Sequence, residues 1–228
     1  MNSLKMFQNR HSRLWANRKS SRRLFRPLVE PLENRLALAV ITVDTTDQEV
    51  NSNDKCSLPE AIYAANFDRS LAIDPTATDL QTFISTACMA GDGDDTIVLE
   101  EGAVYSMSSV VSDPLNQLGP SATPVIFSDI TIRANGATLQ RTGDEHLRLF
   151  SIADLYTGIN VDGHGISAGT RGELTLHDAF VTGFQTHGGD GRAGGGGGLG
   201  AGGAIYVKDS VLYVFNSTFA GNSAIGGN

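Results

Sequence analysis

The sequence holds several carboxylate and imidazole side chains that could take part in the hydrolysis of a polysaccharide. Glycoside hydrolysis requires two carboxylates that flank the scissile bond, one of which acts as the proton donor. The residues that we would substitute first to test such chemistry are Asp162, His164, Asp178 and Asp190. No serine stands in a nucleophile elbow, and the histidines after residue 35 have no ligand-like mutual spacing. We therefore predict no catalytic residues, and keep a polysaccharide-cleaving enzyme as the alternative.

An acidic turn at residues 91–97 fits one copy of a calcium-binding repeat. In the pattern G-x-G-x-D-x-U, aspartate side chains and backbone carbonyls supply the hard oxygen ligands that calcium requires. The candidate ligands are Asp92, Asp94 and Asp95. Because such sites are shared between adjacent repeats and the sequence holds a single copy, we favour a polar turn. We predict no metal and no other cofactor.

A glycine-rich segment follows, with Gly188 and Gly189 at its start and a run of glycines at residues 194–198. Glycine loops expose backbone amides that can bind phosphate. This segment lacks the Lys-Ser/Thr pair of a phosphate-binding loop, and it leads into an expected strand instead of a helix. We predict an inserted, flexible surface loop at residues 188–203 that binds no nucleotide.

The segment that begins at Ser57 has the pattern of a short amphipathic helix. Ser57 and Glu60 form a capping box, and Pro59 suits the first turn. The apolar positions with helical spacing are Leu58, Ala61, Ile62 and Ala65. We expect a helix that ends near residue 66 and lies as a lid over an apolar core. The β-branched run at residues 40–43 predicts a first strand.

The second half of the sequence repeats itself, which is typical of a solenoid. Residues 173–183 align with residues 211–221, so that Leu174 matches Leu212 and Val181 matches Phe219. Apolar pairs at residues 130–132 and 149–152 are interpreted as earlier copies, with starts about 20, 25 and 38 residues apart. If 16 residues of the glycine-rich segment are left out as an insertion, the last interval shortens from 38 to 22 residues. The pattern predicts an all-β solenoid whose coils stack about 4.8 Å apart.

Several strings resemble those of secreted β-helix proteins. Residues 56–66, which read CSLPEAIYAAN, resemble the CSLREAI-x-AAN motif of that family, and residues 128–141 resemble its ITI-x-GNGATI-x-R coil. The family pattern continues with a second cysteine and a Gly/Asp turn, matched here by Cys88 and residues 91–99. The resemblance covers roughly residues 40–228. It implies a right-handed parallel β-helix with a short N-terminal capping helix.

Two tetrapeptides near the end resemble the GGAI and FxxN elements of the polymorphic outer-membrane protein repeat. The first tetrapeptide consists of Gly202, Gly203, Ala204 and Ile205. The second begins at Phe219 and ends at Asn222. The resemblance implies a structural role, in which small residues allow tight turns and the phenylalanine fills the bore. The asparagine would bond its amide to the copies stacked above and below.

The ends of the chain differ sharply in charge. Residues 1–35 hold nine Lys/Arg and two Glu, a net charge of +7, so the remainder carries −15. A basic segment followed by the apolar run at residues 36–41 is typical of an export signal, and we expect cleavage after Ala39. A basic RNA-binding arm is the alternative. Residues 26–39 resemble the LEPR or LEDR-LL segment that precedes the first strand of large bacterial surface proteins.

Two cysteines, Cys56 and Cys88, are the only ones in the sequence. In an exported chain an even pair favours a disulfide over a metal site, because zinc would need two further close ligands. Two buried free thiols are the alternative. No run of 18 or more apolar residues exists, so we expect no transmembrane helix.

We expect three regions along the chain. Residues 1–39 form a basic export segment, residues 40–127 hold the cap and the first coils, and residues 128–228 hold further coils. Since residues 226–228 stand where another glycine-bounded coil is expected, we expect a chain truncated at its C-terminus. Association with an outer membrane would then require sequence beyond residue 228.

The predicted function is that of an exported or cell-surface protein without catalytic activity, active in adhesion, surface structure or ligand display. Its partners would be polysaccharides or other cell-surface ligands. Nucleic acid is excluded as a partner of the folded region, since only eight scattered Lys/Arg follow residue 35. In the alternative, a pectate-lyase-like or polygalacturonase-like enzyme, the site would be incomplete in this chain. Asp94-Asp95 and residues 163–167 do resemble the DD and GHGIS strings of polygalacturonases, but their companion strings are missing.

Overall fold

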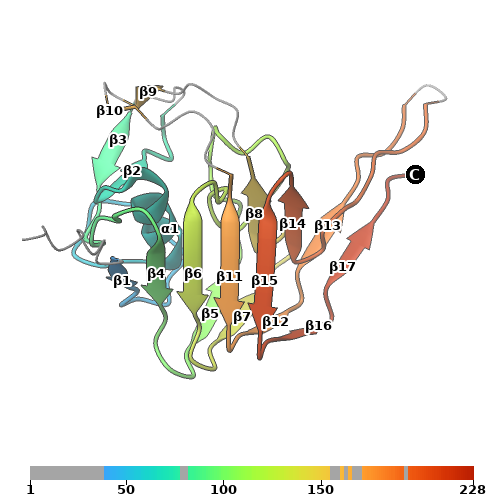
Figure 1. Ribbon diagram of the computed structural model, residues 1–228. Helices are drawn as coiled ribbons and strands as arrows, with labels where there is room; N and C mark the ends of the chain where they lie inside the picture. Colours follow the sequence, from blue (N-terminus) through green and yellow to red (C-terminus); the bar gives the residue numbers. More distant parts are fainter. Residues whose placement is uncertain (1–38, 78–81, 155–159, 162–163, 166–170, 193–194) are drawn as a thin grey trace, which may run out of the picture. The chain divides into compact units, whose positions relative to one another are not determined.

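The computed structural model describes residues 39–77, 82–154, 160–161, 164–165, 171–192 and 195–228 (Figure 1). The predicted export segment, residues 1–39, lies outside the described residues except for Ala39. All described residues belong to one of the two units into which the chain divides, residues 36–228. The secondary structure described below is that of this unit.

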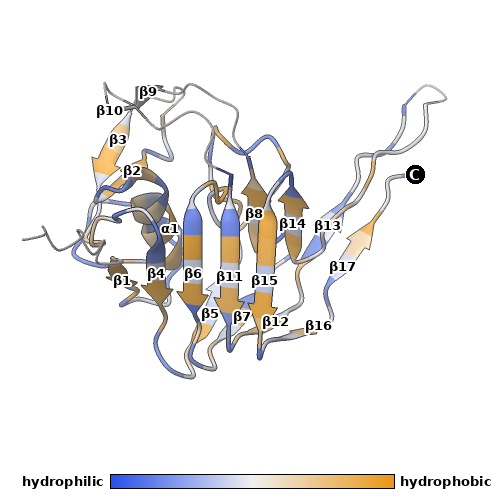
Figure 2. Ribbon diagram, viewed as in Figure 1, coloured by the Kyte–Doolittle hydropathy of each residue, from blue (hydrophilic) through white to orange (hydrophobic). Residues whose placement is uncertain are grey.

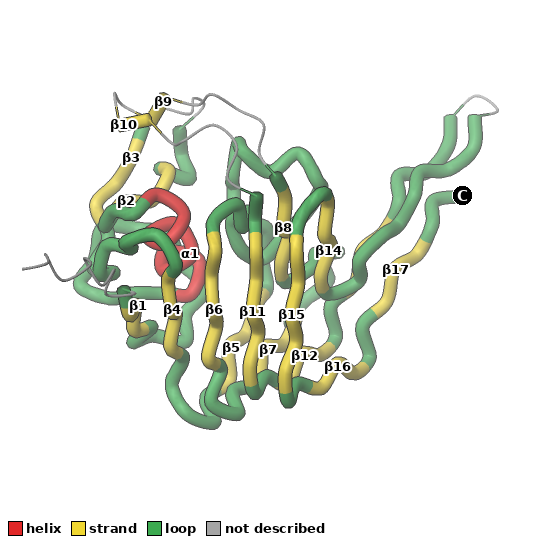
Figure 3. The backbone as a smooth tube through the Cα atoms, in the orientation of Figure 1, coloured by secondary structure: helices red, strands yellow, loops and turns green. Residues whose placement is uncertain are grey.

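The described residues form strands and a single helix, α1 (Leu58–Phe67), so the fold is all-β with one short helix (Figure 3). The first strands are β1 (Val40–Thr42), β2 (Leu71–Ile73), β3 (Phe83–Ser85), β4 (Asp95–Val98), β5 (Val104–Met107), β6 (Asp129–Arg133), β7 (Thr138–Arg141) and β8 (Phe150–Ala153). They are followed by β9 (Asn160–Val161), β10 (His164–Gly165), β11 (Glu173–His177), β12 (Phe180–Thr182) and β13 (Gln185–His187). The last are β14 (Ile205–Lys208), β15 (Val211–Phe215), β16 (Thr218–Ala220) and β17 (Ser223–Ile225).

Most of the strands form parallel sheets. The first sheet has the order β1-β4-β6-β11-β15 and the second the order β16-β12-β7-β5, both parallel throughout. β8 pairs with β14 and β13 pairs with β17, again in parallel. The chain therefore leaves each sheet and returns to it one position further along (Figure 1). Only β2–β3 and β9–β10 are antiparallel among the described strands.

The register of the first sheet confirms the predicted alignment of residues 173–183 with residues 211–221. Leu174 pairs with Leu212, and Val181 pairs with Phe219 in the second sheet. Figure 2 shows the apolar residues in the middle of β6, β11 and β15 and polar residues at the start of β6 and β11. Alternate side chains of β6 and β11 are fully buried, as expected of strands with one face on the core.

The predicted spacing of about 20 residues between early copies is wrong. Residues 150–153 form β8, which pairs with β14 and does not belong to the first sheet. Thr96, Thr131, Thr175 and Tyr213 are the true equivalents, so successive passes through the first sheet are 35, 44 and 38 residues apart. The apolar pair at residues 149–152 imitates a copy because β8 also carries buried apolar side chains two residues apart, Phe150 and Ile152.

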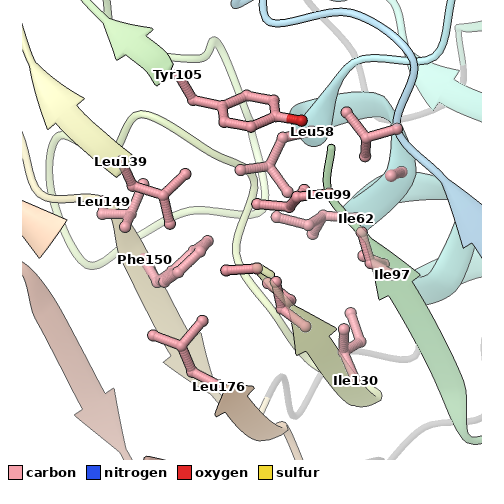
Figure 4. Close-up of a cluster of buried hydrophobic side chains, with 14 of the residues drawn as sticks. Leu58, Ile62, Ile97, Leu99, Tyr105, Ile130, Leu139, Leu149, Phe150 and Leu176 are labelled. Atoms are coloured by element: carbon pink, nitrogen blue, oxygen red, sulfur yellow. The ribbon is translucent and has the colours of Figure 1, made fainter. Parts of the chain in front are cut away.

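The helix α1 covers one end of the buried core, as predicted. Ser57 Oγ accepts from the Glu60 amide at 3.3 Å and Glu60 Oε2 accepts from the Ser57 amide at 2.9 Å, which confirms the capping box. Leu58 and Ile62 lie in the same buried cluster as side chains of the first and second sheets (Figure 4). α1 also contacts β1, β4 and β6, so it closes the core beside the first strands of the first sheet. With ten residues, it is too short and not apolar enough to cross a membrane, and the described residues hold no other helix.

A disulfide joins Cys56 and Cys88, with 4.8 Å between their Cα atoms, which confirms the predicted bond. Both residues are buried. The bond ties the residue before the helix cap to the segment that follows β3. Both cysteines belong to the same buried cluster as Leu58 and Ile62, so the bond fixes the start of α1 against the core.

A buried carboxylate holds the segment beside the helix. Asp113 accepts from the amides of Leu115 at 3.0 Å and Val125 at 2.9 Å. Asn66, at the end of α1, donates to the Val125 carbonyl at 2.7 Å and accepts from the Phe127 amide at 3.1 Å. These bonds satisfy backbone groups that would otherwise be buried without partners. The helix end and residues 113–127 are therefore held together.

The glycine-rich segment lies between β13 and β14, as predicted, but it is not a free loop. Gly188 donates to the Ile225 carbonyl at 2.8 Å, and Gly227 donates to the Gly198 carbonyl at 2.9 Å. A Cβ atom on Gly197 would come within 2.0 Å of the Gly227 carbonyl oxygen, and one on Gly200 within 1.9 Å of the Ile225 oxygen. Backbone therefore packs directly on backbone here. Glycine is required by this close approach and not by flexibility.

The disulfide should contribute strongly to stability. It closes a loop of 32 residues, which corresponds to about 4 kcal/mol through the lost chain entropy of the unfolded state. We expect reduction, or the Cys56→Ala/Cys88→Ala variant, to lower the free energy of unfolding in urea by about this amount. Intact mass should rise by about 2 Da on reduction, because the reductant supplies two electrons that, with two protons, convert the disulfide into two thiols. An unchanged urea midpoint after complete reduction would contradict the prediction.

Stability should also depend on pH through Asp113. Burial raises the pKa of Asp113 from 3.8 to about 6. Since the folded-state pKa lies above the unfolded one, the protonated carboxyl of Asp113 stabilises the folded state. This stabilisation is complete below about pH 4 and is lost as the pH rises through 6. It amounts to as much as about 3 kcal/mol between these limits. In urea titrations, the free energy of unfolding should decline less between pH 4 and pH 6 in Asp113→Asn than in the unaltered protein. An equally steep decline in the variant would contradict the prediction.

Candidate functional site

The turn between the first and second sheets contains an Asn or Asp with a left-handed backbone on three successive passes. Asn135, Asp178 and Asn216 follow β6, β11 and β15, and each has a left-handed backbone, with φ of 51°, 56° and 47°. Asparagine and aspartate are the side-chain-bearing residues that adopt this conformation most readily. The Gly136 amide donates to the Asp178 carbonyl at 2.8 Å, and the Asp178 amide to the Phe215 carbonyl at 3.1 Å. The turns are therefore stacked like the strands that they connect.

These stacked turns form one side of a surface groove of about 720 Å³. Its lining consists of Glu101, Asn135, Gly136, Asp178, Ala179, Phe180, Asn216 and Thr218. Two carboxylates from different passes, Glu101 and Asp178, are exposed in it. The Phe180 side chain is 38% exposed, and its neighbours along the second sheet are Thr138 and Thr218. An apolar ring is thus surrounded by hydroxyl, amide and carboxylate groups.

An aromatic pair stands at the sheet side of the same turns. The rings of His177 and Phe215, which precede Asp178 and Asn216, are stacked with centroids 4.8 Å apart and planes 14° apart. Arg133 occupies the equivalent position on β6. The outer surface of the first sheet therefore ends in a column of planar groups where the groove begins.

The groove is chemically suited to a ligand rich in hydroxyl groups. Glu101 and Asp178 accept hydrogen bonds, while Asn216 and Thr218 both donate and accept. Phe180 offers a flat apolar face for stacking. No Lys or Arg belongs to the lining, so anionic ligands find no counter-charge there. A hydrolytic site needs an apolar pocket that keeps one carboxyl group protonated. The groove lacks such a pocket, because Glu101 and Asp178 both face solvent.

The structure brings only one of the four candidate catalytic residues to this groove. Asp178 lines it, whereas Asp190 lies in the glycine-rich segment and accepts from the Asn228 amide at 2.9 Å. His164 belongs to the short strand β10, and Asp162 lies outside the described residues. The described residues therefore do not assemble the predicted candidates into one site. Sequence reasoning missed Glu101, which lies between β4 and β5, and Phe180, which begins β12 two residues after Asp178.

The candidate calcium ligands belong to a turn in which one of them, Asp95, already bonds to the backbone. Asp95 is 1% exposed, and its Oδ1 accepts from the Asp92 amide at 2.9 Å. Burial raises the pKa of Asp95 to about 6, and Oδ2 is buried without a hydrogen bond from the described residues. Asp92 and Asp94 are exposed. In the described part of the chain, no three Asp, Glu, His or Cys side chains are grouped so as to hold a metal ion.

The GGAI and FxxN residues all lie where one pass meets another. Gly202 has a φ of 65°, and a Cβ atom on Gly203 would come within 2.5 Å of the Ser223 carbonyl oxygen. The Ala204 carbonyl accepts from the Leu149 amide at 2.8 Å. Ile205, at the start of β14, pairs with Phe150 of β8. These residues therefore connect β14 to the earlier pass.

Asn222 has a different partner from the expected one. Its Oδ1 accepts from the Phe184 amide at 2.9 Å and its Nδ2 donates to the Val181 carbonyl at 3.0 Å. Asn222 therefore bonds to the backbone of the preceding pass and not to a stacked asparagine. The residue equivalent to Asn222 on that pass is Phe184. Phe219 pairs with Val181 and points toward the same core.

Comparison with known proteins found no matching protein family, no matching curated protein and no matching solved structure. The resemblances noted in the sequence therefore remain predictions.

The two hydrogen bonds of Asn222 predict a measurable loss of stability on substitution. Asn222→Ala removes a donor and an acceptor and leaves two backbone groups unpaired, which should cost about 2 kcal/mol in urea unfolding. Asn222→Asp keeps the acceptor for the Phe184 amide and should cost less. Asn228→Ala, at another asparagine of the same end of the chain, serves as the control with little change. Equal stability of all three variants would contradict the role of Asn222.

Proposed function

We propose that this chain is a right-handed parallel β-helix whose groove binds a neutral polysaccharide without cleaving it, and that the protein is exported. The order in which the chain visits its sheets supports the fold. Successive passes run β4 then β5, β6 then β7 then β8, and β11 then β12, before β14, β15 and β16. Parallel strands joined by such crossovers are right-handed in nearly all proteins.

The groove is the observation that carries the proposed binding function. Exposed Phe180 lies among donors and acceptors drawn from four passes, and a polysaccharide is a long ligand that presents hydroxyl groups and apolar ring faces in alternation. A groove that crosses stacked turns can contact more than one sugar unit. Affinity would then come from repeated contacts and not from a single deep pocket.

Charge selects among polysaccharides. Residues 36–228 carry a net charge of −15, and Glu101 and Asp178 add negative charge inside the groove. Uronate-rich or sulfated chains would be repelled, and so would nucleic acids. The proposed ligands are therefore neutral glucans, mannans or xylans.

Two features support export. The Cys56–Cys88 disulfide is of the kind that persists in oxidising compartments. Residues 1–35 carry +7 ahead of an apolar run, as an export signal does. The proposed roles are adhesion to, or display on, a surface that contains neutral polysaccharide.

The binding proposal predicts the effect of Phe180→Ala. Loss of ring stacking should weaken binding to a neutral polysaccharide about tenfold in affinity gel electrophoresis, since stacking contributes about 1 kcal/mol or more. Leu199→Ala removes an exposed apolar side chain that is 86% accessible and lies outside the groove lining, so it is the matched control. The panel should contain glucan, mannan and xylan, with polygalacturonate as the acidic comparison.

Two outcomes would contradict the proposed function. If Phe180→Ala and Leu199→Ala bind as the unaltered protein does, the groove is not the binding site. If the protein releases reducing sugars or unsaturated uronides from the panel, and Asp178→Asn abolishes the release, the chain is a polysaccharide-cleaving enzyme with Asp178 in its site. Polysaccharides recovered unchanged, together with weaker binding by Phe180→Ala alone, support binding without cleavage.

A further inference from the structure

A column of outward side chains on the second sheet borders the groove, and is here named the outer column. It takes one residue from each of β5, β7, β12 and β16, and these residues are paired in register: Val104, Thr138, Phe180 and Thr218. The residues next to them along the strands include Leu139 and Val181, which are fully buried. Since side chains alternate along a strand, the outer column lies on the face of the sheet that points away from the core.

The chemistry of the outer column alternates from one pass to the next. Val104 and Phe180 present apolar side chains that are 49% and 38% exposed, whereas Thr138 and Thr218 present hydroxyl groups. A single strand, β7, separates the strands of Val104 and Phe180. Because neighbouring strands lie about 4.8 Å apart, the apolar positions recur about every 10 Å along the stack.

The turn residues that line the groove alternate with the same period. Glu101 and Asp178 carry carboxylates, whereas Asn135 and Asn216 carry amides. The Gly102 amide, next to Glu101, donates to the Asn135 carbonyl at 3.1 Å, so the first of these turns is stacked on the second. Each carboxylate belongs to a pass with an apolar residue in the outer column, and each amide to a pass with a threonine there. The surface therefore repeats after two passes and not after one.

We propose that the groove and the outer column bind an extended β-1,4-linked glucan or mannan that runs along the stack, with one disaccharide for every two passes. This inference rests on the proposed binding of neutral polysaccharide and specifies its linkage. In such a ligand each sugar ring is turned over relative to its neighbours, so every second ring presents the same face. The length of two sugar units is close to two strand spacings, about 10 Å, and thus to the period of the surface.

The two kinds of pass contact the two orientations of the sugar ring differently. A ring at Phe180 lays its apolar face on the side chain, while its hydroxyl groups donate to the Asp178 carboxylate. The next ring is turned over, and its hydroxyl groups exchange hydrogen bonds with Thr138 and Asn135. Glucans with α-1,4 or β-1,3 linkages coil instead of keeping a straight succession of turned-over rings. They can match one pass but lose the register on the following passes.

The test adds one aromatic ring to the outer column at either of two positions. Val104→Phe places the ring two passes from Phe180, in phase with the proposed disaccharide, and Thr138→Phe places it one pass away, out of phase. Val104→Phe should strengthen binding to soluble glucomannan about fivefold in affinity gel electrophoresis, because it adds a second stacked ring. Thr138→Phe, the matched control, should give no gain. Urea midpoints close to that of the unaltered protein would show that both variants fold.

The unaltered protein supplies a second measurement that does not depend on the folding of a variant. It should bind glucomannan about tenfold more tightly than laminarin, a β-1,3-linked glucan, or pullulan, an α-linked glucan. Equal affinity for the three, or an equal gain from Val104→Phe and Thr138→Phe, would overturn the proposed linkage while the proposed polysaccharide binding stands. If no polysaccharide of any linkage is bound, the proposed function fails, and the linkage inference fails with it.

Discussion

The structure depends on one constraint: a single pass of this chain cannot bury its own apolar side chains. Each inward-facing residue is covered by its equivalent on the next pass, as Leu174 is covered between Ile130 and Leu212. The parallel pairing that stacks the passes also satisfies the backbone groups of every interior strand. Burial of one leucine contributes about 2 kcal/mol, so stability accumulates with each pass that is covered on both sides. The helix and the disulfide cover the core beside the first described strands.

The candidate site follows from the same constraint. Glu101, Asn135, Asp178 and Asn216 are far apart in the sequence, and they meet only because strands in register bring their turns into one column. A groove made in this way has a rigid spacing set by the strands and a chemistry set by exposed turn residues. Substitutions in the turns can therefore change the ligand without disturbing the core, provided that the left-handed backbone positions keep residues that tolerate them.

The elements that could be predicted from the sequence are those with a local signal. The helix cap at Ser57 and the pairing of Cys56 with Cys88 depend on residue types and short spacings, and the structure has both. The alignment of the last two passes was also predictable, because both lack long insertions within their strands. The 44-residue step between Thr131 and Thr175 was not, because apolar alternation marks an inward face without telling which sheet it belongs to. The groove was hidden for a related reason, since its residues share no segment, although an Asn or Asp within two residues of the ends of β6, β11 and β15 was a usable signal.

The central claim, that complete passes of 35 to 44 residues stack in parallel register, can be tested with pairs of cysteines. Thr131→Cys/Thr175→Cys places thiols at paired positions of β6 and β11, whereas Thr131→Cys/Ser151→Cys places them at positions that a 20-residue repeat would bring together. Disulfide mapping by mass spectrometry after mild oxidation should show rapid cross-linking of the first pair and none of the second, beside the native Cys56–Cys88 bond. Cross-linking of the second pair, with the first pair unreacted, would contradict the register and with it the stacked turns that form the groove.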